Sequence, residues 1–213
     1  MPKNITVIYA PGARALARQL IGRDFTDEEL AAAVGALDGA TLKAIRKKGA
    51  DELRIEIEHP RIKEQHRWMR RDAQGDLMIF NYRFYKQSGA PAGIGLDSFH
   101  RQVIGARALG VNRIETFGAG DPQSLKHGGE VGYLVWAKFG FNAKLTTMQQ
   151  ARLQQTLGIV GIETLNELIL LPKGEEWWKL NGVSAKMVIE LATDSSMMKV
   201  FRRHLAKKGR TLI

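Results

Sequence analysis

Residues 76–110 constrain the fold most strongly, because they predict a strand, a glycine-rich turn and a helix in immediate succession. The strand "DLMIFNYRFYK" (76–86) carries apolar or aromatic side chains on both faces, which predicts a central position in a sheet. The helix that follows the turn has its apolar residues on one face, and Gly110 predicts its end. The sequence therefore predicts a central strand that leads directly into a helix N-terminus.

The turn "QSGAPAGIG" (87–95) has the composition of an anion-binding site. A helix N-terminus after a strand gathers backbone N–H groups and the positive end of the helix dipole at one place. Glycine at 89, 93 and 95 removes Cβ atoms that would keep a phosphate away, and Lys86 adds a positive charge. The same glycines also suit a plain turn, so the motif alone leaves both interpretations open.

Upstream of residue 76 the sequence predicts strands and two helices. The β-branched run "ITVIYA" (5–10) ends at Pro11 and Gly12, and an amphipathic helix follows. Thr26 and Glu29 form a capping box that begins a second helix. "DELRIEIEHP" (51–60) alternates apolar and charged residues, and "RIKEQHRWMRR" (61–71) is expected to form a hairpin with residues 76–86 through a turn at Gly75.

Downstream of residue 110 the pattern becomes less regular. "NRIETFGAG" (112–120) predicts a strand, and "GGEVGYLVWAKFGF" (128–141) predicts a helix, which gives the order β-α-α-β-β-β-α-β-α. Beyond it we expect short strands at 141–145 and 186–191. Helices are expected at 146–157 and 162–171, and Asp194 or Ser195 is expected to cap a basic C-terminal helix.

Composition narrows the classes of function. The chain carries 32 Lys and Arg against 22 Asp and Glu, a formal net charge of +10, which favours anionic ligands or partners. The basic clusters at 45–49, 66–71 and 199–210 are either solvated faces or nucleic-acid contacts. The lack of cysteine excludes disulfides and a cysteine nucleophile, and the histidines show no metal-ligand spacing, so we predict no metal. Without a signal-peptide pattern or a long apolar run, we expect a cytoplasmic protein that makes no membrane contact.

The order of elements, the turn and residues 128–141 together resemble the GNAT superfamily of acetyl-CoA-dependent N-acetyltransferases. Residues 93–120 are similar to that family's arginine/glutamine-x-x-glycine-x-glycine/alanine turn, third helix and fifth strand, with Ala90 at the first position of the turn. "WAKFGF" (136–141) is similar to the family's closing tyrosine, three residues, Gly-Phe motif, with Trp136 at the usual tyrosine position.

The resemblance implies an α/β fold with a mixed, mostly antiparallel central sheet flanked by helices. It covers residues 1–145 as a GNAT-like acyltransferase domain. Residues 146–213 are then a C-terminal extension that completes the sheet and adds helices.

The same resemblance implies a site for acetyl-CoA between two splayed strands, with no metal, and direct transfer of the acetyl group to an amine. The pantetheine arm pairs with the strand, the turn holds the pyrophosphate, and the closing helix walls the cleft. These contacts fall on Tyr82, Phe84, Lys86, Ser88, Gly89, Gly93, Ile94, Gly95 and Trp136.

The catalytic candidates are Glu115 and Tyr133. The family's tyrosine acid is missing here, because an indole N–H does not act as an acid near neutral pH. Tyr133 precedes Trp136 by three residues, nearly one helical turn, so it is either a substitute acid or a core residue. Glu115 lies within a predicted strand and is either the base or an ion-pair partner of Arg113 or Lys144. Weaker candidates are Asp97, His100 and His127.

The altered tyrosine position also suits a non-catalytic GNAT-like module. Such a module would bind a protein or nucleic acid, with the basic C-terminal helix as one contact, and the motif at 132–141 faintly resembles phage or mobile-element proteins, which implies a virion component. Outside the matched region, Trp177 and Trp178 are expected to clamp a helix to a sheet or to cover a substrate or partner.

Overall fold

A computed structural model describes residues 1–212 of the chain. The described residues form a mixed α/β fold with seven strands and nine helices. They divide into two compact units, which we call unit 1 (residues 1–114 and 212) and unit 2 (residues 115–211). The expected boundary at residue 145 separates a family core from an extension, and it stays a prediction.

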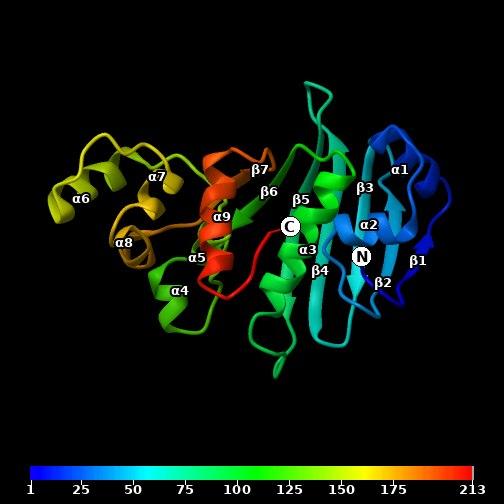
Figure 1. The fold of residues 1–213 in the computed structure, drawn as a ribbon, viewed down its shortest axis with the longest axis horizontal. Helices are drawn as coiled ribbons and strands as arrows, with labels where there is room; N and C mark the ends of the chain where they lie inside the picture. The colour runs from blue at the N-terminus through cyan, green and yellow to red at the C-terminus, as the bar shows by residue number, and fades with distance from the viewer. Residues whose placement is uncertain (213) are drawn as a thin grey trace. The chain divides into compact units, whose positions relative to one another are not determined.

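Unit 1 contains an antiparallel sheet with one parallel edge strand (Figure 1). Neighbouring strands pair in chain order, β1 with β2 in parallel and each later pair antiparallel. The strands are β1 (Thr6–Tyr9), β2 (Thr41–Arg46), β3 (Glu52–Glu58), β4 (Ile62–Arg71) and β5 (Leu77–Lys86). The predicted hairpin of β4 and β5 is confirmed, and Gly75 in its turn has a φ of +85°.

The sequence missed β2, and the expected order is wrong at this point because one strand more precedes the glycine-rich turn. In β2, Leu42 and Ala44 are fully buried, whereas Thr41 and Lys43 alternate with them on the other face. This alternation covers few residues and runs into the basic cluster at 45–49, which resembles a solvated loop. Pairing with β1 and β3 on both sides stabilises a segment whose own pattern is weak.

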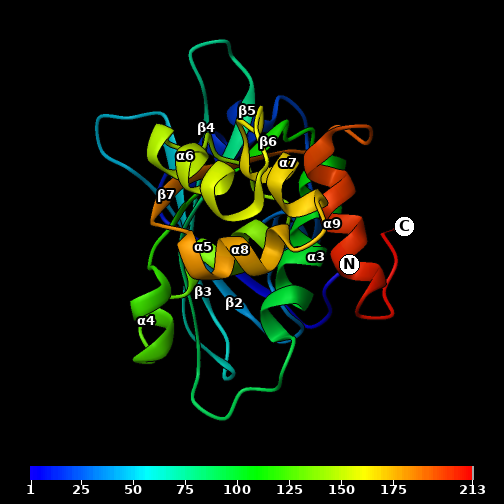
Figure 2. The ribbon, with the colours of Figure 1, turned by 90° about the vertical axis from the view of Figure 1, so that its left-hand side faces the viewer.

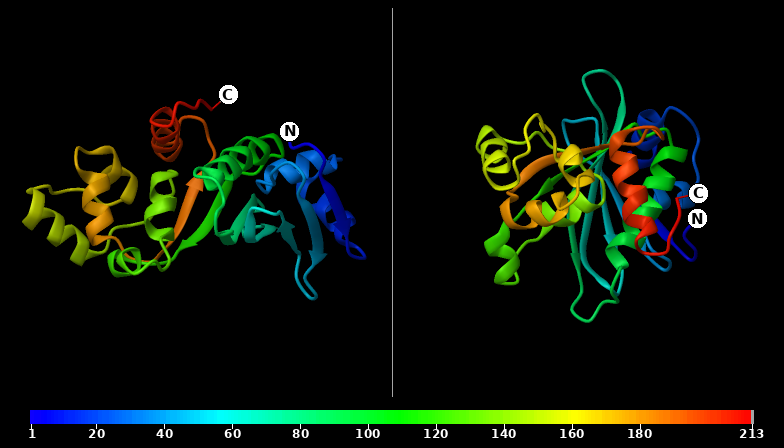
Figure 3. Two further views of the ribbon diagram at one scale, coloured as in Figure 1. Left: turned by 90° about the horizontal axis from the view of Figure 1, so that it is seen from below. Right: turned by 60° about the vertical axis from the view of Figure 1, so that its left-hand side comes forward.

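Three helices cover one face of the unit 1 sheet, as Figures 1 and 3 show. They are α1 (Ala13–Ile21), α2 (Asp27–Ala33) and α3 (Ile94–Ala108). The capping box of Thr26 and Glu29 is confirmed at the start of α2. Gly105 lets α3 approach α2 closely, since a Cβ atom there would lie 2.3 Å from the carbonyl carbon of Ala32. Gly110 ends the helical segment with a φ of +76°, as predicted.

Unit 2 is mainly helical (Figure 2). Strand β6 (Arg113–Gly118) begins at the boundary, and β7 (Ala185–Glu190) is its neighbour. The helices are α4 (Pro122–Lys126), α5 (Gly132–Lys138), α6 (Thr147–Leu157), α7 (Leu165–Leu170), α8 (Gly174–Asn181) and α9 (Ser196–Ala206). Thr146 and Ser195 cap α6 and α9, as expected.

The predicted strand at 141–145 is wrong. Asn142 and Lys144 make only isolated bridges, to Val188 and Thr164 respectively. The apolar side chains of Phe141 and Leu145 are buried, and this burial accounts for the strand-like pattern. A connector therefore produced the same alternation as a strand.

The tryptophan pair clamps helices to one another, so the expectation of a helix held to a sheet is wrong. The Trp178 indole N–H donates to the carbonyl of Tyr133 on α5 at 3.0 Å, and that of Trp177 donates to the Thr156 hydroxyl on α6 at 2.8 Å. Both side chains are buried. Together they fix α8 against two other helices of unit 2.

Candidate functional site

The turn between β5 and α3 presents unpaired backbone donors. The Ala90 amide donates to Gln87, and the Asp97 amide donates to Gly93 in the first turn of α3. In the described part of the chain, no acceptor is bonded to the amides of Ser88, Gly89, Gly93, Gly95 and Leu96. These donors lie at the N-terminus of a helix of 15 residues, where the helix dipole is positive. We call this segment, residues 87–96, the amide turn.

Backbone conformation favours glycine at two positions of the amide turn. Gly89 has a φ of +75°, and Gly93, the N-cap of α3, has a φ of +88°. A Cβ atom at Gly89 would meet no heavy atom within 4 Å, so the space beside this amide is open. Lys86 is exposed at the end of β5 just before the turn. The turn therefore combines free N–H groups, open space and a positive charge, which suits a phosphate.

Gly95 and Phe84 join the turn to the strand. A Cβ atom at Gly95 would lie 3.4 Å from the Phe84 ring, so the ring packs against the first turn of α3. Ile94, the first helical residue, is buried. Among the predicted coenzyme contacts, Phe84 and Ile94 thus contribute packing that fixes the position of the amides.

A β-bulge interrupts β5 at Tyr82, five residues before the amide turn begins. Arg67 pairs with Asn81 and His66 with Arg83, so Tyr82 has no opposite residue on β4. A bulge leaves one residue out of the ladder and bends the strand, and bulges are frequent next to binding sites. Tyr82 therefore stands outside the regular ladder of β4 and β5, at a local bend of the strand.

Arg67 lies on the buried side of the sheet and bonds to both strands at the bulge. The sequence did not identify it as a site residue. Its Nη1 donates to the carbonyls of His66 and Arg83, both at 2.9 Å. The side chain is 1% exposed, its Nε has no partner among the described residues, and burial lowers the pKa of the guanidinium to about 9. The cluster "HRWMRR" resembled a solvated face, yet the alternation of β4 places Gln65, Arg67 and Met69 together on the buried side. That period of two was the signal that could have identified a buried arginine.

A buried polar layer connects the bulge to α3. Asn81, beside Tyr82, exchanges two hydrogen bonds with Gln102 of α3 at 2.9 and 2.8 Å. On β4, Gln65 donates to the Ser98 hydroxyl at 3.2 Å, and Ser98 donates to the carbonyl of Gly35 at 2.7 Å. These side chains are at most 2% exposed, so the bonds are shielded from water. The layer fixes the helix that carries the amide turn relative to the bulged strand.

Glu115 lies in unit 2 on β6. It is 7% exposed, and its carboxylate lies 3.0 Å from the ammonium of Lys186 on β7. Arg113, one of the two partners expected from the sequence, pairs with Asp72 at 2.7 Å. Its pairing with Glu115, and that of Lys144, stay predictions. Glu115 is thus a buried carboxylate with a cation beside it, and its role as a base stays a prediction.

Tyr133 is fully buried in unit 2. Its hydroxyl donates to the carbonyl of Lys179 on α8 at 2.9 Å, and its ring lies 6.5 Å from that of Trp178. Burial, together with the charge of Asp121, raises the pKa of the hydroxyl above its ordinary value. Of the two sequence alternatives for Tyr133, this geometry favours the core residue, and the catalytic role stays a prediction.

Trp136 belongs to an aromatic cluster of unit 2. Its ring meets those of Phe141 and Phe139 edge to face, with centroids 5.0 and 5.9 Å apart. Gly140 ends α5 with a φ of +88°, and a Cβ atom there would lie 2.3 Å from the carbonyl oxygen of Met197 in α9. The Gly-Phe of the closing motif therefore has a structural role, which is to end one helix and admit another.

The basic C-terminal helix α9 uses several of its cations inside unit 2. Arg202 donates to the carbonyl of Thr193, and Arg203 donates to that of Leu170 at 3.2 Å. Lys207 pairs with Glu175 at 3.3 Å. Lys199 and Lys208 are exposed. Much of this predicted polyanion surface therefore stabilises the unit itself.

The predicted site residues fall into two groups. Eight of the predicted coenzyme contacts, residues 82–95, lie together in unit 1 along one strand, turn and helix. Glu115, Tyr133 and Trp136 belong to unit 2, where each has a defined partner. The three weaker candidates, Asp97, His100 and His127, lie on α3 or at the end of α4.

The described residues contain neither a metal-ligand cluster nor a helix that could span a membrane. Residues 1–212 bring together no group of three His, Asp or Glu side chains that could hold a metal ion. In the same range, none of the helices combines the length and the apolar character that crossing a bilayer requires. Comparisons with protein-family models and with curated proteins give no match to this chain.

Proposed function

We propose that this protein is an acyl-CoA-dependent N-acyltransferase that transfers an acetyl group to an amine by direct attack. The single observation that carries the proposal is the set of unbonded amides in the amide turn, at the N-terminus of α3 and at the end of the bulged strand β5. A diphosphate needs convergent N–H donors, and the N-terminus of a helix supplies them. A strand that leads into such a turn is what the resemblance to the GNAT superfamily leads us to expect.

In this proposal the residues of unit 1 bind and orient the coenzyme. The amides of Ser88, Gly89, Gly93 and Gly95 hold its pyrophosphate, and Lys86 adds a charge. In the family that the chain resembles, the strand before the turn pairs with the pantetheine arm, and we assign that contact to the segment from Tyr82 to Lys86. Acetyl-CoA supplies the acyl group in activated form, as a thioester.

The resemblance to the family leads us to expect a base that accepts the proton of the attacking amine, and Glu115 stays the sequence candidate for it. No acid is required for the departing thiolate, because a thiol has a pKa of about 8.5 and leaves near neutrality without full protonation. General-acid help is worth about 10²–10⁴ in rate, so an enzyme without it is slower but active. Trp136 and Tyr133, both within the packing of unit 2, have structural roles in this proposal.

Thermal unfolding with and without acetyl-CoA tests the binding half of the proposal. Ligand at about 100 times its dissociation constant stabilises the folded state by roughly 2.7 kcal/mol, so we expect a clear rise in Tm. Desulfo-CoA, which keeps the pyrophosphate and pantetheine, should give a similar rise. If neither compound changes Tm at millimolar concentration, the enzyme proposal fails.

A non-catalytic module is the second candidate, and one observation favours it. The position of the family's tyrosine acid holds Trp136, and the nearest tyrosine hydroxyl is bonded to Lys179. Such a module would bind CoA without turnover, or bind no CoA at all. Release of free thiol from acetyl-CoA in the presence of a panel of amines separates the two, since only the enzyme produces it.

A further inference from the structure

Arg67 carries a buried positive charge that no carboxylate in the described part of the chain neutralises. Its side chain is 1% exposed, and Nη1 donates to the backbone carbonyls of His66 and Arg83. Among residues 1–212, Nε has no hydrogen-bond partner, and no acid forms an ion pair with the guanidinium. Carbonyl oxygens accept hydrogen bonds but bring no net charge. The positive charge of Arg67 is therefore left unbalanced within the fold.

The hydrogen bonds at the bulge do not explain why this residue is charged. A buried charge without a partner costs stability, because a protein interior solvates an ion less well than water does. A neutral amide side chain could donate to the same carbonyls without that cost. By contrast, Arg54, Arg70 and Arg83 on the opposite face of the sheet each meet a carboxylate. An anion that comes from outside the chain would account for the charge at Arg67.

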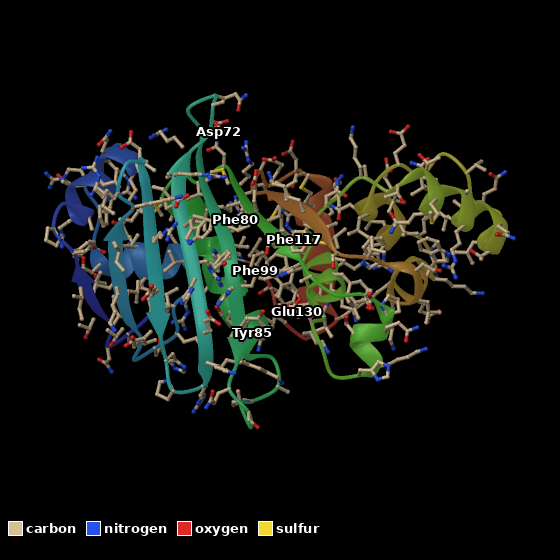
Figure 4. All side chains as sticks on the ribbon, turned by 180° about the vertical axis from the view of Figure 1, so that it is seen from behind. Asp72, Phe80, Tyr85, Phe99, Phe117 and Glu130 are labelled. Atoms are coloured by element: carbon tan, nitrogen blue, oxygen red, sulfur yellow. The ribbon has the colours of Figure 1, made fainter. Side chains whose placement is uncertain are left out.

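Arg67 lies on the side of the sheet that faces α3, close to the amide turn. Its partner across the strands is Asn81, whose side chain bonds to α3. The guanidinium carbon lies 5.9 Å from the centroid of the Phe84 ring, and a Cβ atom at Gly95 would lie 3.4 Å from the same ring. Figure 4 views the sheet from the other side, with Phe80 on the near strands and α3 behind them. Arg67 and the first turn of α3 therefore contact a single ring between them.

The charge of Arg67 adds to the positive potential that the dipole of α3 creates at the amide turn. Over a separation on the order of 10 Å, at an effective dielectric constant of about 20, one unit charge changes the affinity for another by about tenfold. A buried charge is also screened by salt much less than an exposed one such as Lys86. A multiply charged anion gains most from this arrangement, and an uncharged ligand gains nothing.

We propose that Arg67 is a buried counter-charge for the amide turn, and that it makes the turn select a diphosphate over an uncharged ligand. Arg67 acts through its field and through the bulge it holds, without touching the ligand, so it is a positioning residue. The inference rests on the anion site of the proposed function, but it does not require acyl transfer.

The test compares Arg67→Gln with Arg67→Lys, because both keep N–H donors for the two carbonyls and only lysine keeps a charge. Isothermal titration measures the Kd of inorganic pyrophosphate for wild type and each full-length variant, at about pH 6 because burial lowers the pKa of a lysine. We expect Arg67→Gln to bind at least about threefold more weakly than Arg67→Lys and wild type. Should Arg67→Gln not fold, Arg67→Met takes its place with the same expected loss.

Salt separates the buried charge from an exposed one at the same turn. Lys86→Gln removes the exposed charge, and its effect on the Kd should shrink between about 0.1 and 1 M salt, as the Debye length falls from about 10 to 3 Å. The ratio of the Kd of Arg67→Gln to that of Arg67→Lys should change little over the same range.

Three results would overturn the inference. The first is a wild-type protein that does not bind pyrophosphate at millimolar concentration. The second is an Arg67→Gln variant that binds as well as wild type, or an Arg67→Lys variant that binds as weakly as Arg67→Gln, since the charge would then have no role. The third is a ratio at Arg67 that shrinks with salt as much as the effect of Lys86→Gln. If wild type binds pyrophosphate but not acetyl-CoA, the acyltransferase proposal fails, and the same variants still decide the role of Arg67.

Discussion

Unit 1 and unit 2 differ in whether the polar groups of their predicted sites have hydrogen-bond or ion-pair partners. In unit 1 the buried side chains Gln65, Asn81 and Gln102 form hydrogen bonds with one another or with Ser98 and backbone carbonyls. In the amide turn, by contrast, the amides of Ser88, Gly89, Gly93, Gly95 and Leu96 have no acceptor among the described residues. In unit 2 the groups that suggested chemistry, on Tyr133 and Glu115, are each engaged by a neighbour. The difference favours unit 1 as the place of the proposed ligand site, whereas the aromatic residues of unit 2 hold its helices together.

The largest expected difference between the two units is the loss of folding stability when an aromatic residue of each is replaced. Trp178→Ala removes a ring that is 1% exposed together with its hydrogen bond to Tyr133, and should lower the free energy of unfolding by about 3–5 kcal/mol. Tyr82→Ala removes a half-exposed stacked ring of unit 1 and should lower it by about 0.5–1.5 kcal/mol. Urea unfolding measures both. Equal losses would contradict the division between a structural and a surface aromatic set.

Tyr133→Phe should cause an intermediate loss of stability. It also tests whether Tyr133 is a catalytic acid or a residue of the core. Removing the hydroxyl leaves the Lys179 carbonyl without its donor, which should cost about 1–3 kcal/mol of stability. We expect kcat for acyl transfer to be unchanged, measured where the variant is fully folded. A fall in kcat of about 10² or more, with little change in Tm, would instead assign the acid to Tyr133.

The pH dependence of unit 2 should show a smaller effect at His204. Burial and the nearby charge of Lys138 lower the pKa of this histidine below its ordinary value of 6.5, with Glu175 opposing and Lys207 and Lys208 adding to the decrease. Because the folded pKa is the lower one, the unfolded chain binds the proton first as the pH falls through about 6.5, and stability is lost below that point. In wild type this histidine should contribute a loss of less than about 1 kcal/mol in the free energy of unfolding between about pH 6.5 and 5. Urea unfolding at several pH values should show that His204→Gln lacks this part of the loss. A steeper fall in the variant would mean that the charged form is favoured in the folded state.

The sequence predicted best where several local signals agreed. The capping residues Thr26, Thr146 and Ser195 and the left-handed glycines Gly75 and Gly110 were identified correctly, because caps and turns depend on a few adjacent residues. Strand β2 was missed and a strand at 141–145 was wrongly expected. In both segments pairing with distant residues decides the conformation, and a short alternation does not report it.

The sequence predicted the glycine-rich turn of the candidate site, but not the bulge and the buried side chains that hold it in place. The glycine spacing at 89–95 indicated the amide turn, but nothing in "HRWMRR" or "FNYRF" by itself indicates a bulge at Tyr82 held by a buried Arg67. A bulge is a property of two strands in register, so one strand's sequence does not define it. The position of Tyr133 likewise depends on Trp178 and Lys179 of α8, which lie beside it only in the folded chain.

The central claim is that the amide turn of unit 1 binds the diphosphate of CoA, and a matched pair of variants at Gly89 tests it most directly. Both Asn and Asp tolerate the φ of +75° there, and the space beside Gly89 is open, so Gly89→Asn and Gly89→Asp differ in charge alone. Isothermal titration of acetyl-CoA should give a Kd for Gly89→Asp about tenfold or more above that of Gly89→Asn. The repulsion between the Asp carboxylate and a diphosphate bound beside it amounts to about 1.4 kcal/mol or more, which corresponds to a factor of about ten. Equal dissociation constants for the two variants, with measurable binding in both, would contradict the claim and place the diphosphate elsewhere.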